Sequence, residues 1–115
     1  MSLEGKSVYG RSAMAQHILR FISGKYEGGE FPLEDNAQVT IGREPGVEMV
    51  IFEEGVSRNH ARISVSAGRV FIKDLGATNG TFVNGERITD RELKIGDKIL
   101  IGSSIIRLSS AHPGR

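Results

Sequence analysis

The sequence predicts an all-β domain, built as a two-sheet antiparallel β-sandwich. Short apolar runs rich in Ile, Val and Phe recur along the chain, and Gly, Asn, Asp, Glu or Pro bound each run, as is typical of strands separated by turns. No segment shows the 3.6-residue apolar period of an amphipathic helix. Many short strands with dense turns favour a sandwich whose loops gather at the ends of the sheets.

Nine segments have the apolar content of a strand. In chain order they cover 17–23, 30–33, 38–42, 49–52, 60–66, 69–75, 81–83, 97–101 and 104–109. The turn residues that bound them are Gly24, Gly28 and Gly29, Asp35 and Asn36, Pro45 and Gly46, Glu54 and Gly55, Gly68, Gly76, Gly85, Gly96 and Gly102. The pattern is most regular over 60–66, where apolar Ala61, Ile63 and Val65 alternate with polar residues. That period of two predicts a strand with one buried and one solvated face.

Two of the turns have the sequence of a tight hairpin. Ala67-Gly68 joins the segments 60–66 and 69–75, and Asn84-Gly85 follows the segment 81–83. Asn-Gly supplies the positive φ angles that a type I′ turn requires. We therefore expect a β-hairpin at each of these two positions.

The length of the chain limits it to one ordinary domain. With 115 residues it can bury a core but cannot hold two such domains. Residues 1–15 carry Ser, Gly, Lys, Arg and small residues and show no apolar period, so we expect a flexible lead-in there, a folded domain over 16–110 and a short tail over 111–115.

Composition excludes several classes of function. Fifteen basic residues against fourteen acidic ones leave a net charge of +1, which does not suggest a nucleic-acid-binding protein. The absence of cysteine excludes disulfides, thiolate metal sites and a thiol nucleophile, and it favours the cytoplasm. No apolar run approaches the roughly 18 residues of a membrane-spanning helix, so we expect no membrane association.

The balanced total conceals an uneven distribution of charge. Residues 27–54 contain eight acidic side chains and a single basic one, Arg43. A lone arginine in an acidic segment can form a surface ion pair with Glu44 or Glu48, but it can also belong to an anion-binding site.

Three predicted loops concentrate polar residues beyond what a turn of the chain needs. They cover residues 41–43, 55–60 and 74–85, and together they contain arginines, hydroxyls, asparagines and several glycines. A guanidinium can contact two phosphate oxygens at once, and nearby hydroxyl or backbone N–H groups supply further donors. These residue types suit a phosphoryl dianion.

The order of four short motifs resembles the forkhead-associated (FHA) domain family. They are Gly42-Arg43, Ser57-Arg58-Asn59-His60, Thr78-Asn79-Gly80-Thr81 and Asn84-Gly85. Each motif is common by itself, but four in this order on a β pattern are specific. The strand pattern from about residue 17 to residue 109 extends the resemblance over most of the chain.

The resemblance implies a sandwich of about eleven strands that binds phosphothreonine in a partner protein, a substrate of a Ser/Thr kinase. By analogy with the family, Arg43 and Ser57 contact the phosphate, Thr78 completes the phosphate site and Arg58 adds charge at its edge. Asn79 holds the main chain of the bound peptide.

Three further positions match residues that support the site in the family. Gly42 and Gly80 correspond to conformational glycines, and His60 to a structural histidine that does not touch the ligand. The resemblance implies no catalytic residue, metal or cofactor. We expect a monomer, or a fragment of a larger multidomain protein, in either case a regulatory module of signal transduction.

One position departs from the family pattern. Some members carry a basic residue two positions before the matching serine, where it helps to recognise the third peptide residue after the phosphothreonine, but this chain has Gly55 there. Arg62, Arg69 or Arg87 can take that role if the fold brings one of them near.

Two alternative functions stay open at this point. Ser57, His60 and Asp74 are the residue types of a serine hydrolase triad, although triads are defined by geometry and the segment 55–59 lacks the second glycine of a nucleophile elbow. A protein-interaction sandwich that ignores phosphate is the other alternative.

Overall fold

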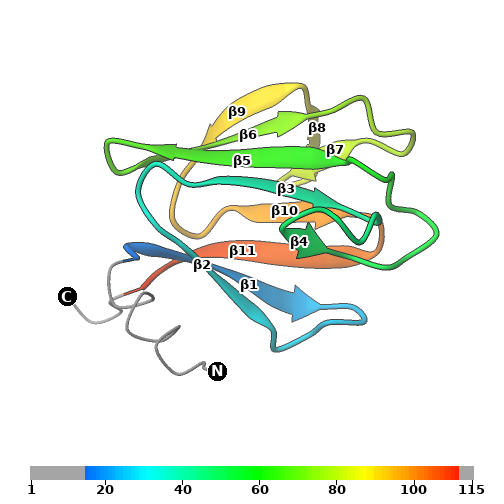
Figure 1. The fold of residues 1–115 in the computed structure, drawn as a ribbon, viewed down its shortest axis with the longest axis horizontal. Helices are drawn as coiled ribbons and strands as arrows, with labels where there is room; N and C mark the ends of the chain where they lie inside the picture. The colour runs from blue at the N-terminus through cyan, green and yellow to red at the C-terminus, as the bar shows by residue number, and fades with distance from the viewer. Residues whose placement is uncertain (1–14, 112–115) are drawn as a thin grey trace.

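The structure, a computed structural model, describes residues 15–111 and has eleven strands and no helix in that range. The strands are β1 (His17–Ser23), β2 (Glu30–Leu33), β3 (Gln38–Gly42), β4 (Met49–Val50), β5 (Ala61–Ser66), β6 (Arg69–Asp74), β7 (Thr81–Val83), β8 (Glu86–Ile88), β9 (Asp90–Leu93), β10 (Lys98–Ile101) and β11 (Ser104–Ser110). The predicted all-β class and the implied number of strands are confirmed (Figure 1).

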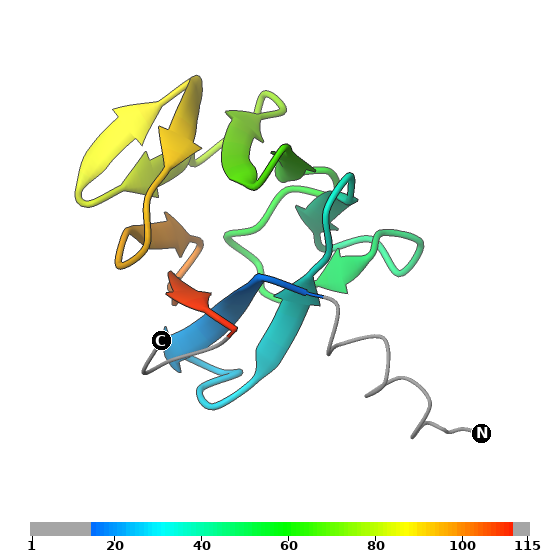
Figure 2. The same cartoon turned by 90° about the vertical axis from the view of Figure 1, so that its left-hand side faces the viewer.

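The strands form two sheets that face each other across the core (Figure 2). One sheet has the order β2-β1-β11-β10-β7-β8 and the other the order β4-β3-β5-β6-β9. Neighbouring strands are antiparallel with one exception, because β4 pairs with β3 in parallel over Met49 and Val50. The sandwich predicted from the sequence is therefore correct, with this one short parallel pair added.

The alternation of side chains decides which face of each strand is buried. In β5, Ala61, Ile63 and Val65 are buried while the intervening residues are not, as the period of two predicts. From the opposite sheet, Leu19 and Ile106 are fully buried against them in the same core cluster. Burial of these branched apolar side chains between the two inner faces is the main force that holds the sheets together.

Both predicted hairpins are confirmed. Ala67 and Gly68 have φ angles of 53° and 76°, and Asn84 and Gly85 have φ angles of 51° and 84°. Positive φ at both central residues is the signature of a type I′ turn, and the flanking strands pair antiparallel in each case.

The structure differs from the predicted strands at three places. β8 and β9 were not expected, because each is short and polar, with Ile88 and Leu93 as the one buried residue of its strand. Both are edge strands, where polar residues are common. The segment predicted over 49–52 ends at Val50, after which the chain turns so that Ile51 is buried and Phe52 is exposed.

The predicted domain limits remain predictions. Residues 1–14 and 112–115, which contain nearly all of the predicted lead-in and tail, lie outside the described residues. Ala15 is fully buried, and the N–H of Ala111 donates to the carbonyl of Gln16 at 3.1 Å. Within 15–111 there is no helix long and apolar enough to cross a bilayer.

The loops that carry the predicted motifs lie at one end of the sandwich. The β1–β2, β3–β4, β4–β5 and β6–β7 connections and the β10–β11 turn are all on the right in Figure 1, whereas the β5–β6 hairpin is on the left. Residues more than 30 positions apart in sequence therefore meet at this end, which we call the loop end.

Candidate functional site

His60 lies in the middle of the loop end and is fully buried. Its backbone N–H donates to the carbonyl of Ile41 at 2.8 Å, and its carbonyl accepts from the N–H of Leu75 at 2.9 Å. These two bonds connect the backbone of His60, which directly precedes β5, to the ends of β3 and β6.

The imidazole ring of His60 joins two loops. The N–H of Ser57 donates to Nδ1 at 3.1 Å, so Nδ1 carries a lone pair and the proton is on Nε2. Nε2 then donates to the carbonyl of Gly80 at 2.9 Å. Both ring nitrogens are bonded to main chain inside the protein, and neither is directed at a ligand.

Ser57 connects the β4–β5 loop to the β6–β7 loop. Its Oγ accepts a hydrogen bond from the N–H of Thr78 at 3.1 Å. A hydroxyl that accepts in this way still has its own proton to donate. Ser57 can therefore hold the neighbouring loop and donate to a bound anion at the same time, and this bond brings the backbone of Thr78 beside it.

Arg43 follows directly after β3 and is held by the β4–β5 loop. Its backbone N–H donates to the carbonyl of Ser57 at 3.0 Å, and its Nε donates to the carbonyl of Val56 at 2.9 Å. The two Nη groups have no partner within residues 15–111, and no ion pair joins Arg43 to Glu44 or Glu48 there. The guanidinium is oriented by one bond while its outer donors remain available.

Gly42 has to be a glycine because the β4–β5 loop crosses it closely. A Cβ atom at this position would overlap the carbonyl oxygen of Arg58 and lie 2.7 Å from its carbonyl carbon. Both obstacles are backbone atoms, so they cannot move aside as a flexible side chain can. The side chain of Arg58 is exposed, and its carbonyl accepts from the N–H of Glu44, the residue after Arg43, at 3.4 Å.

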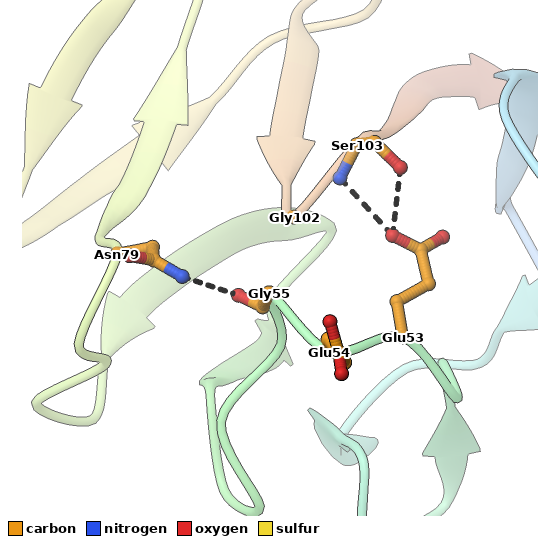
Figure 3. A pocket seen from close by; sticks show the side chains of 6 residues that line it. All are labelled: Glu53, Glu54, Gly55, Asn79, Gly102 and Ser103. Carbon is orange, nitrogen blue, oxygen red and sulfur yellow. Dashed lines mark hydrogen bonds between the residues drawn. The ribbon is translucent and has the colours of Figure 1, made fainter.

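Asn79 borders a hollow between the β4–β5, β6–β7 and β10–β11 connections (Figure 3). Its Nδ2 donates to the carbonyl of Gly55 at 3.1 Å, which leaves the second amide proton and the amide oxygen for other partners. The hollow measures about 540 Å³ and is lined by Glu53, Glu54, Gly55, Asn79, Gly102 and Ser103.

Glu53 ties the β4–β5 loop to the β10–β11 turn (Figure 3). Its Oε1 accepts from the N–H and Oγ of Ser103 at 3.1 and 2.9 Å, and its Oε2 accepts from Oγ of Ser104 at 2.6 Å. Burial disfavours the ionised form, but the hydrogen bonds from Ser104 and Ser103 outweigh it and lower the pKa of Glu53 below its ordinary value.

Asp74 and Thr81 organise the β6–β7 loop, and the sequence analysis did not identify this role. Oδ1 of Asp74 accepts from Oγ1 of the fully buried Thr81 at 2.6 Å, and Oδ2 accepts from the N–H groups of Gly76 and Ala77 at 3.0 and 3.3 Å. The available signal was an aspartate two positions before a glycine, the pattern of an Asx turn. Because these groups occupy the Asp74 carboxylate, it does not contact His60, and the three residues do not form a hydrolase triad.

Arg62, Arg69 and Arg87, which could take the role of the basic residue missing at position 55, lie in different parts of the structure. Arg69 forms two hydrogen bonds with Glu92, at 2.8 and 3.0 Å, and Nε of Arg62 donates to Oγ1 of Thr40 at 3.3 Å. By contrast, the Arg87 guanidinium packs on Gly80, where Nε would lie 2.8 Å from an added Cβ. Of the three, Arg87 is the one beside the candidate site.

The loop end thus gathers donors from separate parts of the chain. The outer guanidinium groups of Arg43, the hydroxyls of Ser57 and Thr78, the amide of Asn79 and the exposed side chain of Arg58 come from the β3–β4, β4–β5 and β6–β7 connections. None of these five residues is acidic. Such a set of guanidinium, hydroxyl and amide donors suits a phosphate attached to a peptide.

Comparison with known proteins gives a consistent result. A family model of the FHA domain matches residues 39–102, which include all five of these residues. The oxoglutarate dehydrogenase inhibitor of Corynebacterium efficiens is 37% identical over 79 residues, which is 69% of this chain and 55% of that protein. The chain therefore spans about half the length of the curated relatives it matches.

Solved structures show the same fold. An FHA domain from a structural and functional analysis of phosphothreonine-dependent FHA domain interactions superposes with a TM-score of 0.76 at 31% identity, covering 85% of this chain and 98% of that one. Mycobacterium tuberculosis EmbR, in complex with a low-affinity phosphopeptide, superposes with a TM-score of 0.77 at 29% identity, covering 96% of this chain and 30% of that one.

Proposed function

Because the chain belongs to the FHA domain family, we propose that its loop end binds phosphothreonine in a segment of a partner protein. The observation that carries this proposal is the orientation of Arg43, whose Nε is bonded to the carbonyl of Val56 while neither Nη group has a partner among residues 15–111. A guanidinium fixed in this way loses little freedom when it forms two parallel bonds to phosphate oxygens.

The remaining residues divide into ligand contacts and support. In this proposal Ser57 and Thr78 donate their hydroxyls to the phosphate, Arg58 adds positive charge at its edge, and Asn79 bonds the main chain of the peptide. The position of Asn79 supports that assignment, since it lines a hollow of about 540 Å³, and its amide oxygen and second amide proton have no partner among residues 15–111.

Three buried residues, Gly42, His60 and Gly80, support the site without contacting the ligand in this proposal. Gly42 allows the β4–β5 loop to cross β3, and His60 bonds both the β4–β5 loop and the carbonyl of Gly80. We propose that these three residues hold the donors in place before the ligand arrives, and that the protein is a binding module without catalytic activity.

A paired titration tests the proposed function. A phosphothreonine peptide and the same peptide without phosphate are titrated against the protein by calorimetry, with the phosphoserine version as a third ligand. We expect either that only the phosphothreonine peptide binds, or that it binds at least tenfold more tightly than the unphosphorylated and phosphoserine peptides. Equal binding with and without phosphate would instead support the phosphate-independent interaction sandwich.

A further inference from the structure

Phe52 is the most exposed large apolar side chain among residues 15–111, with 63% of its surface accessible. It follows the fully buried Ile51 at the start of the β4–β5 loop. Isolated apolar residues on a surface are ordinary. Phe52 differs from that ordinary case because its position is fixed and it lies beside the proposed phosphate site.

The β1–β2 loop holds the backbone of Phe52 from both sides. Its N–H donates to Oη of Tyr26 at 3.0 Å, and its carbonyl accepts from Nζ of Lys25 at 3.1 Å. Tyr26 in turn packs against Phe21 of the core, with the ring centroids 5.6 Å apart. The exposed ring is therefore attached to a rigid part of the sandwich.

Lys25 also restrains the ring itself. Its Nζ lies 5.3 Å from the centroid of Phe52 and 5.6 Å from that of Tyr26, which is within the range of a cation–π interaction. An aromatic side chain that is already ordered loses little entropy when a partner covers it. Exposed, ordered aromatic residues are the type that contributes most to protein interfaces.

A hollow of about 220 Å³ lies between Phe52 and Arg43. It is lined by Lys25, Arg43, Phe52, Glu53 and Glu54. Its surface is mainly apolar although four of these residues are charged, so the aromatic ring and the aliphatic parts of the long side chains form most of it. Among the residues assigned to the phosphopeptide, only Arg43 also lines this hollow, so the hollow lies next to the proposed phosphate site. It shares Glu53 and Glu54 with the hollow at Asn79, so the two hollows adjoin.

We propose that Phe52 and this hollow bind an apolar side chain of the same phosphothreonine-containing segment, a few residues from the phosphothreonine. The inference rests on the proposed function, because it needs the phosphate on Arg43 to bring the segment there. Glu53 and Glu54 at the rim disfavour an acidic side chain, and the Lys25 ammonium is already bonded to the carbonyl of Phe52. An extended chain advances about 3.3 Å per residue, so a residue near the phosphothreonine reaches the hollow.

The test uses a set of phosphothreonine peptides with alanine at every flanking position. One leucine is moved through the flanking positions on either side, and each peptide is titrated against the unmodified protein, Phe52→Ser and Ile95→Ser. Ile95 is a matched control, because it is 56% exposed and lies between β9 and β10, away from the loop end.

We expect one position at which leucine tightens binding about five- to tenfold, the effect of burying one apolar side chain in part. That gain should disappear in Phe52→Ser and persist in Ile95→Ser, while the all-alanine peptide binds all three proteins equally. The absence of such a position, or a gain that survives in Phe52→Ser, would overturn the inference. Weaker binding of the all-alanine peptide to Phe52→Ser would also overturn it, because Phe52 would then act through the phosphate site. Failure of every phosphothreonine peptide to bind the unmodified protein would refute the proposed function instead.

Discussion

The two ends of the sandwich are built in different ways. At the β5–β6 hairpin, Ala67 and Gly68 reverse the chain by their own positive φ angles, and the strands on either side pair directly. At the loop end, the connections are held by contacts between distant residues, such as the bonds from the His60 ring to Ser57 and Gly80. The hairpin end therefore depends mainly on local conformation, with one exposed long-range bond from the N–H of Gly68 to Oδ1 of Asp35 at 3.4 Å. The loop end depends instead on buried polar contacts that form only in the folded protein.

This difference separates residues that hold the loop end together from residues that are left free on its surface. His60 and Thr81 are fully buried and have their hydrogen-bonding groups satisfied inside the protein. Arg43 and Asn79 each use one side-chain group for the fold, and their other donors have no partner among residues 15–111. Substitutions should accordingly affect binding, stability, or neither, depending on where they are made.

The largest effect is expected at Arg43. Arg43→Ala should weaken phosphothreonine-peptide binding by about 100-fold or more, because the phosphate loses a bidentate, charge-assisted partner. Stability should fall by only about 1 kcal/mol, from the lost bond to the carbonyl of Val56. Calorimetric titration and urea unfolding measure the two quantities. Arg107→Ala, an exposed arginine on β11, is the control and should bind normally.

His60→Ala should act on stability first. The change leaves a cavity and two unsatisfied main-chain groups at a fully buried position, so we expect the free energy of unfolding to fall by about 3 kcal/mol. Affinity should decline less than in Arg43→Ala when both are measured well below the unfolding transition. If His60→Ala lost as much affinity as Arg43→Ala without any loss of stability, the assignment of His60 to support would be wrong.

Glu53 should make the loop end sensitive to acid. Its folded-state pKa is below the ordinary value of 4.5, so the ionised carboxylate stabilises the fold. That contribution is fully present above the unfolded-state pKa and is lost as the pH falls through the lower folded-state pKa. Glu53→Gln should therefore be less stable than the unmodified protein by about 1 kcal/mol at pH 7, with the difference shrinking below pH 4.

Urea unfolding of both proteins between pH 7 and pH 3 measures the Glu53 effect. Glu54→Gln is the matched control, because the neighbouring Glu54 is exposed and forms no hydrogen bond or ion pair in residues 15–111. A stability difference for Glu53→Gln that stays constant over this pH range would show that the carboxylate charge is not responsible.

The smallest effect is expected at the hairpin end. Ala67 has a φ of 53°, which costs an L-residue with a Cβ more than it costs glycine. Ala67→Gly should raise the free energy of unfolding by about 0.5 kcal/mol and leave peptide affinity unchanged. A change in affinity would mean that the hairpin end and the loop end are energetically coupled and are not held together independently.

The same distinction explains what could be predicted from the sequence. The strand at 60–66 and the turn at Asn84-Gly85 were correctly predicted, because alternation and turn composition act locally. β8 was missed because Glu86 and Arg87 give it no apolar pattern. The four family motifs correctly identified the fold and the loops.

Contacts between the loops could not be predicted, because they join residues that are distant in sequence. The bonds from Glu53 to Ser103 and Ser104 span about 50 positions, and no local pattern indicates them. Similarly, Phe52 belonged to the strand predicted over 49–52, yet the strand ends at Val50 and Phe52 is exposed. Which apolar residue of a short run faces solvent depends on the tertiary path of the chain.

The pairing of β1 with β11 has a consequence for how such a domain can be carried in a longer polypeptide. His17 at the start of β1 pairs with Ser110 at the end of β11, and both lie at the end of the sandwich opposite the loop end. Adjacent entry and exit points allow a folded unit to be inserted or tethered with little disturbance. Segments attached at this corner would leave the binding face unobstructed, so one such domain can be joined to many different neighbours without redesign of its site.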